Sequence, residues 1–284
     1  MKHGLFLPPF GEFANPRRVA DLAAAAEQAG WDGLYLWDHI LAAPGVAVAD
    51  TWTTLAAIAM STTRIRFGPL VTPLARRRPW VLARQIATVD HLSGGRLTVG
   101  VGLGDDGWRE FSAFGEETSP AGRGELLDES LELLVRFLAG NEVSFRGARF
   151  VIDSGPLLPR PVQDPVPIWA AVRWPNSRPL ARAAALHGCF PIFPADAEVL
   201  APPSAADLAA LQAKLTGLGA PRSHDLVVSI SADQLATAEQ DDVAQAMAEA
   251  GVTWLLANFG RRPAAEVEAQ VAAGPPEASG RLGG

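Results

Sequence analysis

The chain has 284 residues, of which 48% are hydrophobic, and a formal net charge of -7; this excludes wholesale disorder and argues against a nucleic-acid-binding protein, which usually presents a basic face. Its single cysteine, Cys189, excludes a disulfide framework or a thiolate metal site built within the chain. Because no apolar run reaches the ~18 residues of a membrane span and no signal-peptide pattern begins the sequence, we expect a cytoplasmic protein without a membrane segment.

Short apolar runs alternate with helical patterns along the whole chain. Strands are predicted over 3–10, 33–39, 65–73, 96–104, 166–172, 188–193, 225–231 and 252–259. Helices follow them over 16–30, 51–62, 80–95, 123–140, 176–187, 204–219, 239–251 and 263–274. Several strands are apolar on both faces, as parallel strands beneath helices are. Eight such units predict one α/β domain over residues 1–274, a (β/α)8 TIM barrel, with an open doubly wound sheet as the alternative.

Two segments exceed the minimal barrel, and the chain ends in a polar tail. Residues 105–122 form a long insertion after the fourth strand, and residues 141–165, before the fifth strand, contain the predicted hairpin VSFRGARFVI. The last residues, 275–284, are rich in glycine and proline and are predicted to be a disordered tail.

The stretch GLYLWDHI, residues 33–40, ends an apolar strand in Asp38-His39. TIM-barrel active sites lie at the carboxyl ends of the strands, so the fold directs this pair to the functional face. Histidine exchanges a proton near neutral pH, which makes His39 the candidate for acid–base chemistry. The alternative is a strand-end histidine that only forms hydrogen bonds. No histidine pair has the spacing of a metal site, so we expect no metal.

Other strand ends are open to two interpretations each. GVGLG, residues 100–104, fails the GxGxxG dinucleotide pattern because Asp105 follows it; its glycines admit either a flat ligand or a neighbouring backbone. The run of arginines 76–78 precedes a helix and either holds an anion or is a solvated charge run. The segment 173–178 also precedes a helix, where Asn176 or Ser177 could cap it and free N–H groups could bind a phosphate.

Four stretches together resemble the luciferase-like monooxygenase family, whose members are barrels that use FMN or the deazaflavin coenzyme F420. They are GLYLWDH (33–39), the long block 64–104, EFSAFG (110–115) and PVQDPVPIWAA (161–171). The resemblance implies that Asp38 and His39 are the catalytic pair beside the reactive ring, as in deazaflavin-dependent members.

The resemblance also implies a set of cofactor-binding residues, with a bulge or a non-prolyl cis bond in the third strand: Phe6, Leu70, Val71, Thr72, Gly102, Leu103, Gly104, Arg173, Asn176 and Ser177. Two departures stand out. The family often has two glycines after the fifth strand, where this chain has the run 170–174, and Asp-Gly-Trp before the sixth, where this chain has the run 187–189. Two acids, Asp105 and Glu110, remain candidates for a further role in the site.

The leading hypothesis is therefore F420-dependent hydride transfer to or from a small organic substrate. The alternatives are an FMN- and oxygen-dependent monooxygenase, a cofactor-free barrel hydrolase or lyase, and a relative that binds flavin without turnover. Aromatic residues near the strand ends, Phe10, Trp37, Trp108 and Trp174, predict an apolar or aromatic substrate. The resemblance also implies a homodimer.

Overall fold

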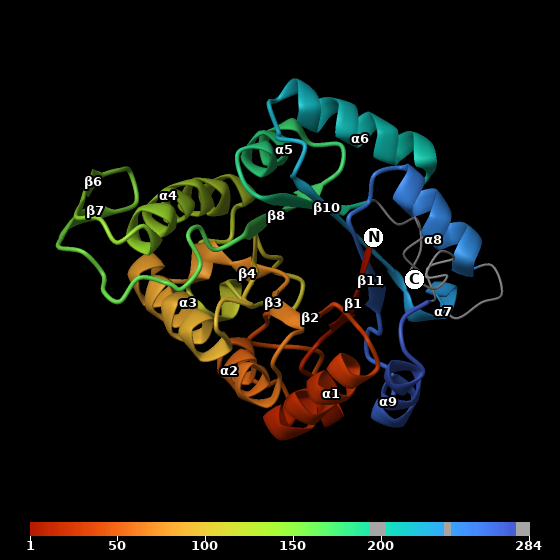
Figure 1. Ribbon diagram of the computed structural model, residues 1–284. Helices are drawn as coiled ribbons and strands as arrows, with labels where there is room; N and C mark the ends of the chain where they lie inside the picture. Colours follow the sequence, from red (N-terminus) through yellow and green to blue (C-terminus); the bar gives the residue numbers. More distant parts are fainter. Residues whose placement is uncertain (194–202, 236–239, 277–284) are drawn as a thin grey trace.

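The computed structural model describes residues 1–193, 203–235 and 240–276. Its central feature is a parallel sheet that curls into a barrel (Figure 1). The barrel strands are β1 (Lys2–Leu7), β2 (Gly33–Leu36), β3 (Arg66–Pro69), β4 (Thr72–Pro73), β5 (Val99–Gly102), β8 (Ile168–Arg173), β9 (Gly188–Ile192), β10 (Asp225–Ser231) and β11 (Trp254–Asn258). Neighbours are bonded in the order β3-β2-β1-β11-β10-β9-β8-β5-β4.

Strands β3 and β4 occupy a single position in the barrel wall. β3 pairs with β2, and β4 pairs with β5. Between β3 and β5 the wall is closed by a bridge from Phe67 to Leu97 and by the hydrogen bond from Thr98 N to Phe67 O, 2.9 Å. The eight predicted strands and the (β/α)8 TIM barrel are therefore confirmed, and the open sheet is excluded.

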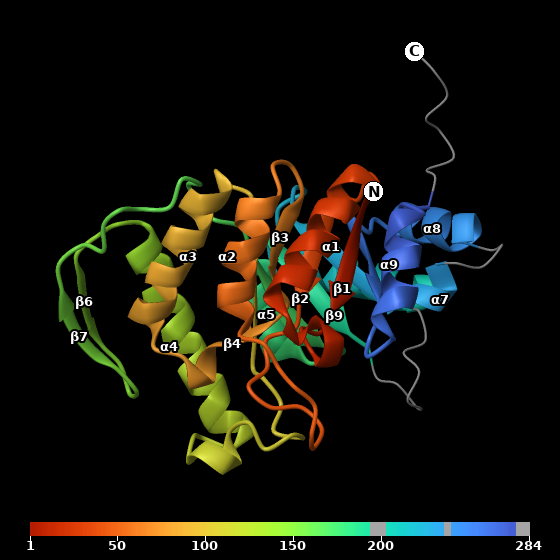
Figure 2. The same cartoon turned by 90° about the horizontal axis from the view of Figure 1, so that it is seen from below.

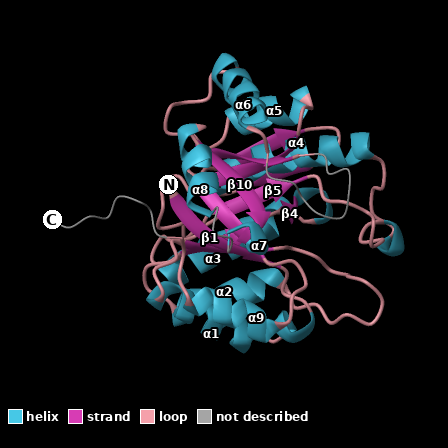
Figure 3. Ribbon diagram, turned by 90° about the vertical axis from the view of Figure 1, so that its right-hand side faces the viewer, coloured by secondary structure: helices cyan, strands magenta, loops and turns pink. Residues whose placement is uncertain are grey.

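Helices surround the strands, as Figure 3 shows. They are α1 (Pro16–Gln28), α2 (Thr51–Ser61), α3 (Pro79–Ser93), α4 (Pro120–Leu138), α5 (Ser177–Ala184), α6 (Ala205–Gly217), α7 (Ala232–Leu235), α8 (Gln240–Glu249) and α9 (Ala264–Ala272). Side-chain hydrogen bonds cap the first turn of several helices: Asn15 accepts from Arg17 N at 3.0 Å at the start of α1, and Asp50 accepts from Thr53 N at 2.7 Å at the start of α2. None of the helices in these ranges is long and apolar enough to cross a membrane.

The predicted hairpin lies outside the barrel, beside α4 (Figure 2). It consists of β6 (Val143–Arg146) and β7 (Val151–Ser154), which pair antiparallel. The Glu129 carboxylate of α4 accepts hydrogen bonds from the backbone N–H groups of residues 148–150, at 2.7 to 3.2 Å, and so fastens the hairpin. Most of the predicted tail, residues 277–284, lies outside the described residues.

Aromatic rings fill the barrel interior toward the amino ends of the strands. Tyr35, Trp169 and Trp254 are all buried, with ring centroids 5.0 to 5.6 Å apart. Tight packing of this kind closes the barrel to ligands at that level, because a barrel interior is a core and not a pore. A cavity at the carboxyl ends of the strands is therefore closed on its inner side by these rings.

Candidate active site

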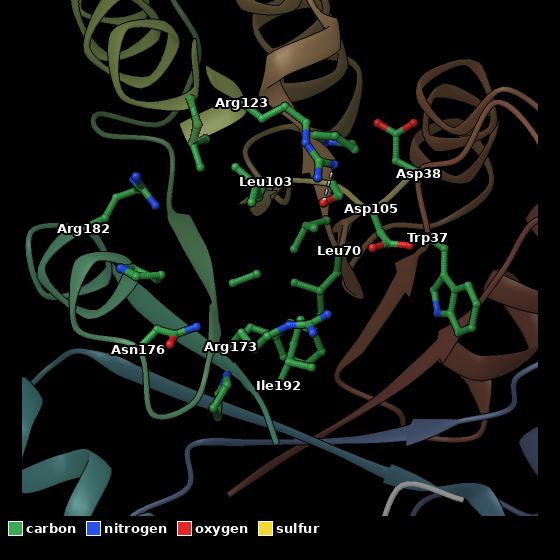
Figure 4. A pocket seen from close by; sticks show the side chains of 18 of the residues that line it. Trp37, Asp38, Leu70, Leu103, Asp105, Arg123, Arg173, Asn176, Arg182 and Ile192 are labelled. Carbon is green, nitrogen blue, oxygen red and sulfur yellow. Dashed lines mark hydrogen bonds between the residues drawn. The ribbon is translucent and has the colours of Figure 1, made fainter. Parts of the chain in front are cut away.

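A cavity of about 760 Å³ opens at the carboxyl ends of the barrel strands (Figure 4). Its volume lies within the range of small-molecule and cofactor sites. The wall is formed by residues from nearly every βα unit, among them Phe6, Trp37, His39, Leu70, Val71, Leu103, Gly104, Arg123, Leu127, Ala171, Arg173, Phe190, Ser229 and Asn258. Most of this surface is apolar, and its charged part consists of four arginines and three acids: Arg123, Arg173, Arg178, Arg182, Asp38, Asp105 and Glu110.

The histidine predicted to be catalytic is held by an acid from the long insertion. His39 Nδ1 lies 2.6 Å from Glu110 Oε2, although 71 residues separate the two in sequence. The His39 side chain is 24% exposed, whereas that of Glu110 is 2% exposed. The other Glu110 oxygen accepts from the backbone N–H groups of Ile40, at 2.5 Å, and Leu41, at 3.3 Å. The insertion after β5 is thus anchored directly to the end of β2.

The surroundings of Glu110 keep its carboxylate ionised. Burial acts to raise its pKa, but the hydrogen bond and charge of His39, the Ile40 N–H group and the Arg76 charge together lower it below the ordinary value. An ionised acceptor at Nδ1 places the proton of a neutral imidazole on that nitrogen. Nε2 then carries the lone pair and is the ring nitrogen that remains for a ligand in the cavity.

Asp38, the other residue of the pair that the resemblance implied, lines the cavity and is held by several protein groups. It is 3% exposed, and its carboxylate accepts from Thr72 Oγ1 at 2.8 Å and from Arg77 Nη2 at 2.7 and 2.8 Å. Arg76 Nη2 lies 2.7 Å from the Asp38 carbonyl oxygen and 3.3 Å from Oδ1. With every lone pair engaged by the protein, this carboxylate supports the strand end that carries His39.

Two of the three arginines at 76–78 therefore hold an internal anion, whereas Arg78 is exposed and lies over the Trp80 ring. The Arg76 side chain is only 2% exposed; it bonds Asp38 and lies 3.4 Å from Glu110 Oε1. The Arg77 side chain is 18% exposed and also pairs with Asp38. Neither a solvated charge run nor a site for an external phosphate describes these two residues.

The glycines of GVGLG serve the neighbouring strand. A Cβ at Gly100 would lie 2.6 Å from Leu70 Cδ1 and from the Pro69 carbonyl oxygen, and one at Gly102 would lie 2.6 Å from Val71 Cγ2. Gly100 therefore admits the close approach of another backbone, whereas Gly102 makes room for the Val71 side chain. The approaching segment is the β3–β4 junction, where the Leu70–Val71 peptide is cis and non-prolyl.

The predicted cofactor-binding residues divide into two groups. Phe6, Leu70, Val71, Leu103, Gly104, Arg173 and Asn176 line the cavity. Thr72, Gly102 and Ser177 do not line it. Thr72 is fully buried and accepts from Trp52 Nε1 at 3.1 Å while donating to Asp38, so its part is to support the strand end. Among the aromatic residues, Phe10 and Trp108 pack around the His39 ring, with centroids 5.6 and 4.9 Å away, whereas Trp174 packs under Lys214 outside the cavity.

Two features of the site were not identified from the sequence. Glu110 was one of two open candidates, and no local pattern shows that its loop returns to β2. Arg123, in the first turns of α4, was not considered, yet it lines the cavity and is 6% exposed. Within the described part of the chain, no group of three or more histidine, cysteine, aspartate or glutamate side chains is arranged to hold a metal ion.

A comparison with protein families bears on all of these features. The model of the family described as luciferase-like monooxygenase matches residues 1–281. The chain belongs to the luciferase-like monooxygenase family.

Curated relatives in this family include F420-dependent enzymes. The F420-dependent glucose-6-phosphate dehydrogenase of Nakamurella multipartita is 33% identical over 173 residues, which cover 59% of this chain and 50% of that protein. Its counterpart in Amycolatopsis mediterranei is 32% identical over 165 residues, covering 57% of this chain and 49% of that protein. The chain thus spans about half the length of these relatives.

Solved structures share the fold over almost the whole chain. An F420-dependent secondary alcohol dehydrogenase, in complex with an F420–acetone adduct, superposes with a TM-score of 0.77 at 18% identity, covering 96% of both chains. The monooxygenase RslO1 from Streptomyces bottropensis superposes with a TM-score of 0.74 at 21% identity, covering 95% of this chain and 96% of that one. Because the identities are only 18% and 21%, these two structures show that the chain shares their fold and nothing more.

Proposed function

We propose that this protein is an F420-dependent oxidoreductase that transfers a hydride to or from a small organic substrate. One observation supports it above the others: His39, paired with Glu110, faces a large apolar cavity at the end of β2. The Asp38-His39 sequence resembles that of deazaflavin-dependent family members, and two curated relatives are named as F420-dependent dehydrogenases. An FMN- and oxygen-dependent monooxygenase is the second candidate, because the family is described as luciferase-like monooxygenase and the monooxygenase RslO1 shares the fold.

The cavity suits a planar heteroaromatic ring. Its wall carries the apolar side chains of Phe6, Leu70 and Val71. Two residues of the wall each carry a buried polar atom without a hydrogen-bond partner: Nε1 of Trp37 and Oγ of Ser229. Buried polar groups normally find a partner, so a ring with amide and carbonyl edges would complement this wall. Bound there, F420 supplies the carbon that accepts or donates hydride, and FMN supplies oxygen chemistry.

The chain's own residues would bind, orient and exchange a proton. His39 Nε2 would accept a proton from a substrate hydroxyl as hydride leaves, or return it in the reverse direction. Glu110 would hold the imidazole in the required tautomer and stabilise its protonated form. Asp38, Arg76 and Arg77 would keep the strand end rigid, so that the imidazole does not drift from the cavity.

The segment after β8 would bind the phosphate end of the cofactor. Arg173 and Asn176 line the cavity. Asn176 stands at the N-cap of α5, but its side chain forms no capping hydrogen bond. The first N–H groups of α5 are therefore free for an anion, which a helix N-terminus favours. An arginine and this helix end would replace the two glycines that the family often has here.

The experiment is a spectroscopic titration of the protein with F420 and FMN, each oxidised and reduced, followed by turnover assays. We expect tight binding of F420, and His39→Ala should retain that binding while losing about 10² to 10⁴ of the turnover rate. His91→Ala is the matched control, because that side chain lies on the outer surface of α3. Tight binding of reduced FMN alone would support the monooxygenase instead. Binding of neither would refute both.

We further propose that the protein forms a homodimer through α2 and α3, which lie side by side in Figure 2. Large apolar side chains on these helices face outward: Met60 is 70% exposed, Val81 50% and Leu92 42%. A contiguous exposed apolar patch marks an association face, and we assign these three side chains to such a face. Light scattering should give twice the chain mass, and Met60→Lys combined with Leu92→Lys should give the monomer. A wild-type monomer at micromolar concentration would contradict the proposal.

A further inference from the structure

One residue of the long insertion has an unusual backbone conformation. Among the residues that the structure describes, Arg109 is the only one other than glycine with a positive φ, 59°. This left-handed region is disfavoured for a residue that carries a Cβ. The Arg109 side chain is exposed and forms no hydrogen bond or ion pair with a described residue, so its own contacts do not account for the conformation. Backbone strain of this kind is concentrated where it places functional groups.

The residues on either side of Arg109 both contact His39. Glu110 Oε2 lies 2.6 Å from His39 Nδ1. The ring centroid of Trp108 lies 4.9 Å from that of the imidazole, with an angle of 59° between the two planes. Trp108 also packs edge-on against Phe10, with 5.7 Å between the ring centroids. A carboxylate therefore holds the imidazole at Nδ1, and an indole packs beside its ring.

Hydrogen bonds on both sides fix the backbone of Arg109. Its N–H group donates to the carbonyl oxygen of Asp106 at 2.9 Å, and its own carbonyl oxygen accepts from Ala113 N at 3.0 Å. The Asp106 carboxylate also accepts from Phe111 N at 2.8 Å. The left-handed residue thus joins two successive turns, and such a conformation persists only where its surroundings impose it.

Trp108 and Arg109 differ from the residues that they flank in their relation to the cavity. His39 and Glu110 line the cavity, whereas Trp108 and Arg109 do not. A ligand in the cavity can therefore touch the imidazole without touching the indole beside it. A change at Trp108 or Arg109 should alter the orientation of the imidazole and leave the ligand-binding wall intact.

We propose that Arg109 and Trp108 are positioning residues for His39. The left-handed backbone of Arg109 brings Trp108 and Glu110 to the imidazole together, and the indole then prevents the ring from rotating away from the carboxylate. Such support keeps Nε2 directed at the cavity, because a reactive group needs neighbours that lock its rotamer. The assignment deepens the proposed function and rests on it for the reaction, but the state of the imidazole can be measured without cofactor or substrate.

The test is ¹⁵N spectroscopy of histidine-labelled protein without cofactor, with the His39 signals identified by their loss in His39→Ala. The neutral imidazole of the wild type should carry its proton on Nδ1. Arg109→Gly should retain this tautomer, because glycine adopts a positive φ without strain. Arg109→Val keeps the backbone N–H group, but a β-branched residue resists this region, so the preference for Nδ1 should be lost. Arg146→Val makes the same change at an exposed position of strand β6 and should have no effect.

Trp108→Leu tests the indole without changing Arg109. The smaller side chain leaves space beside the imidazole, so the ring can rotate away from Glu110 and the preference for Nδ1 should weaken. Trp108→Phe restores an aromatic ring and should regain the preference. Because it leaves the backbone of Arg109 unaltered, Trp108→Leu also decides the question if Arg109→Val does not fold.

Turnover supplies a second measurement, which does depend on the proposed function. In an F420-dependent assay, Arg109→Val and Trp108→Leu should each lower kcat, by up to about a hundredfold. The Kd of F420 should stay unchanged, because neither residue lines the cavity. If no flavin binds, the proposed function fails, and the cofactor-free spectra still test the assignment. Wild-type spectra of His39 in both Arg109→Val and Trp108→Leu would overturn it.

Discussion

Asp38→Asn tests whether Asp38 supports the strand end. Asp38 and Glu110 balance the charges of Arg76 and Arg77 in a buried cluster. Asparagine keeps the shape and one acceptor oxygen but leaves the cluster with an uncompensated positive charge. Breaking a buried pair costs about 3 to 5 kcal/mol. Because the Arg77 side chain is 18% exposed and can regain water, we expect about 3 kcal/mol, at the lower end.

The assay is urea unfolding followed by circular dichroism. With a slope of about 3 kcal/mol per molar urea, the loss shifts the midpoint down by about 1 M. Glu132→Gln is the matched control, because Glu132 pairs with Arg136 one helical turn away and both side chains are about half exposed. Such a surface pair contributes about 0.5 kcal/mol or less. A midpoint for Asp38→Asn that matches the control would refute the structural role of Asp38.

Three further substitutions probe other parts of the molecule. In Gly68→Ala the new Cβ would lie 1.7 Å from the carbonyl oxygen of Thr98, the residue before β5, so we expect a loss of about 3 kcal/mol or more in the free energy of unfolding, measured by thermal unfolding. Gly217→Ala meets no atom within 4 Å and should be neutral or stabilising. Burial raises the pKa of Glu27, but backbone N–H groups of residues 63–65 outweigh it and lower that pKa to about 2. The ionised Glu27 carboxylate therefore stabilises the fold fully above its pKa in the unfolded chain, near ~4.3, and this stabilisation is lost as the pH falls toward about 2. We expect Glu27→Gln to cost about 1 to 2 kcal/mol of unfolding free energy at neutral pH, after allowance for solvent screening. This cost should shrink in urea midpoints taken between about pH 5 and pH 3, and a constant cost would contradict the reasoning. Glu110→Gln removes the charge beside the imidazole, and ¹⁵N spectra should show the neutral ring losing its preference for a proton on Nδ1; an unchanged tautomer would be evidence against the positioning role.

Local patterns were sufficient for the barrel and for part of the site. Alternating strand and helix periodicity, with caps such as Asn15, located every element of the eight βα units, because these signals depend on near neighbours in sequence. The strand-end rule then brought His39 and the segment at 70–71 to one cavity. The sequence left the role of Gly100 and Gly102 open, because a missing side chain does not show whether a backbone, a side chain or a ligand fills the space.

The sequence by itself determined the barrel, the order of its strands and the end of the barrel at which His39 lies. It could do so because hydrophobic periodicity, helix caps and turn residues depend on only a few neighbouring positions. Only the tertiary structure decided how the charges pair. It showed that Glu110 holds His39 and that Asp38 pairs with Arg76 and Arg77. Pairing of this kind depends on loops that return from distant strands when the barrel closes, and the energy of each charge depends on burial that no local pattern records.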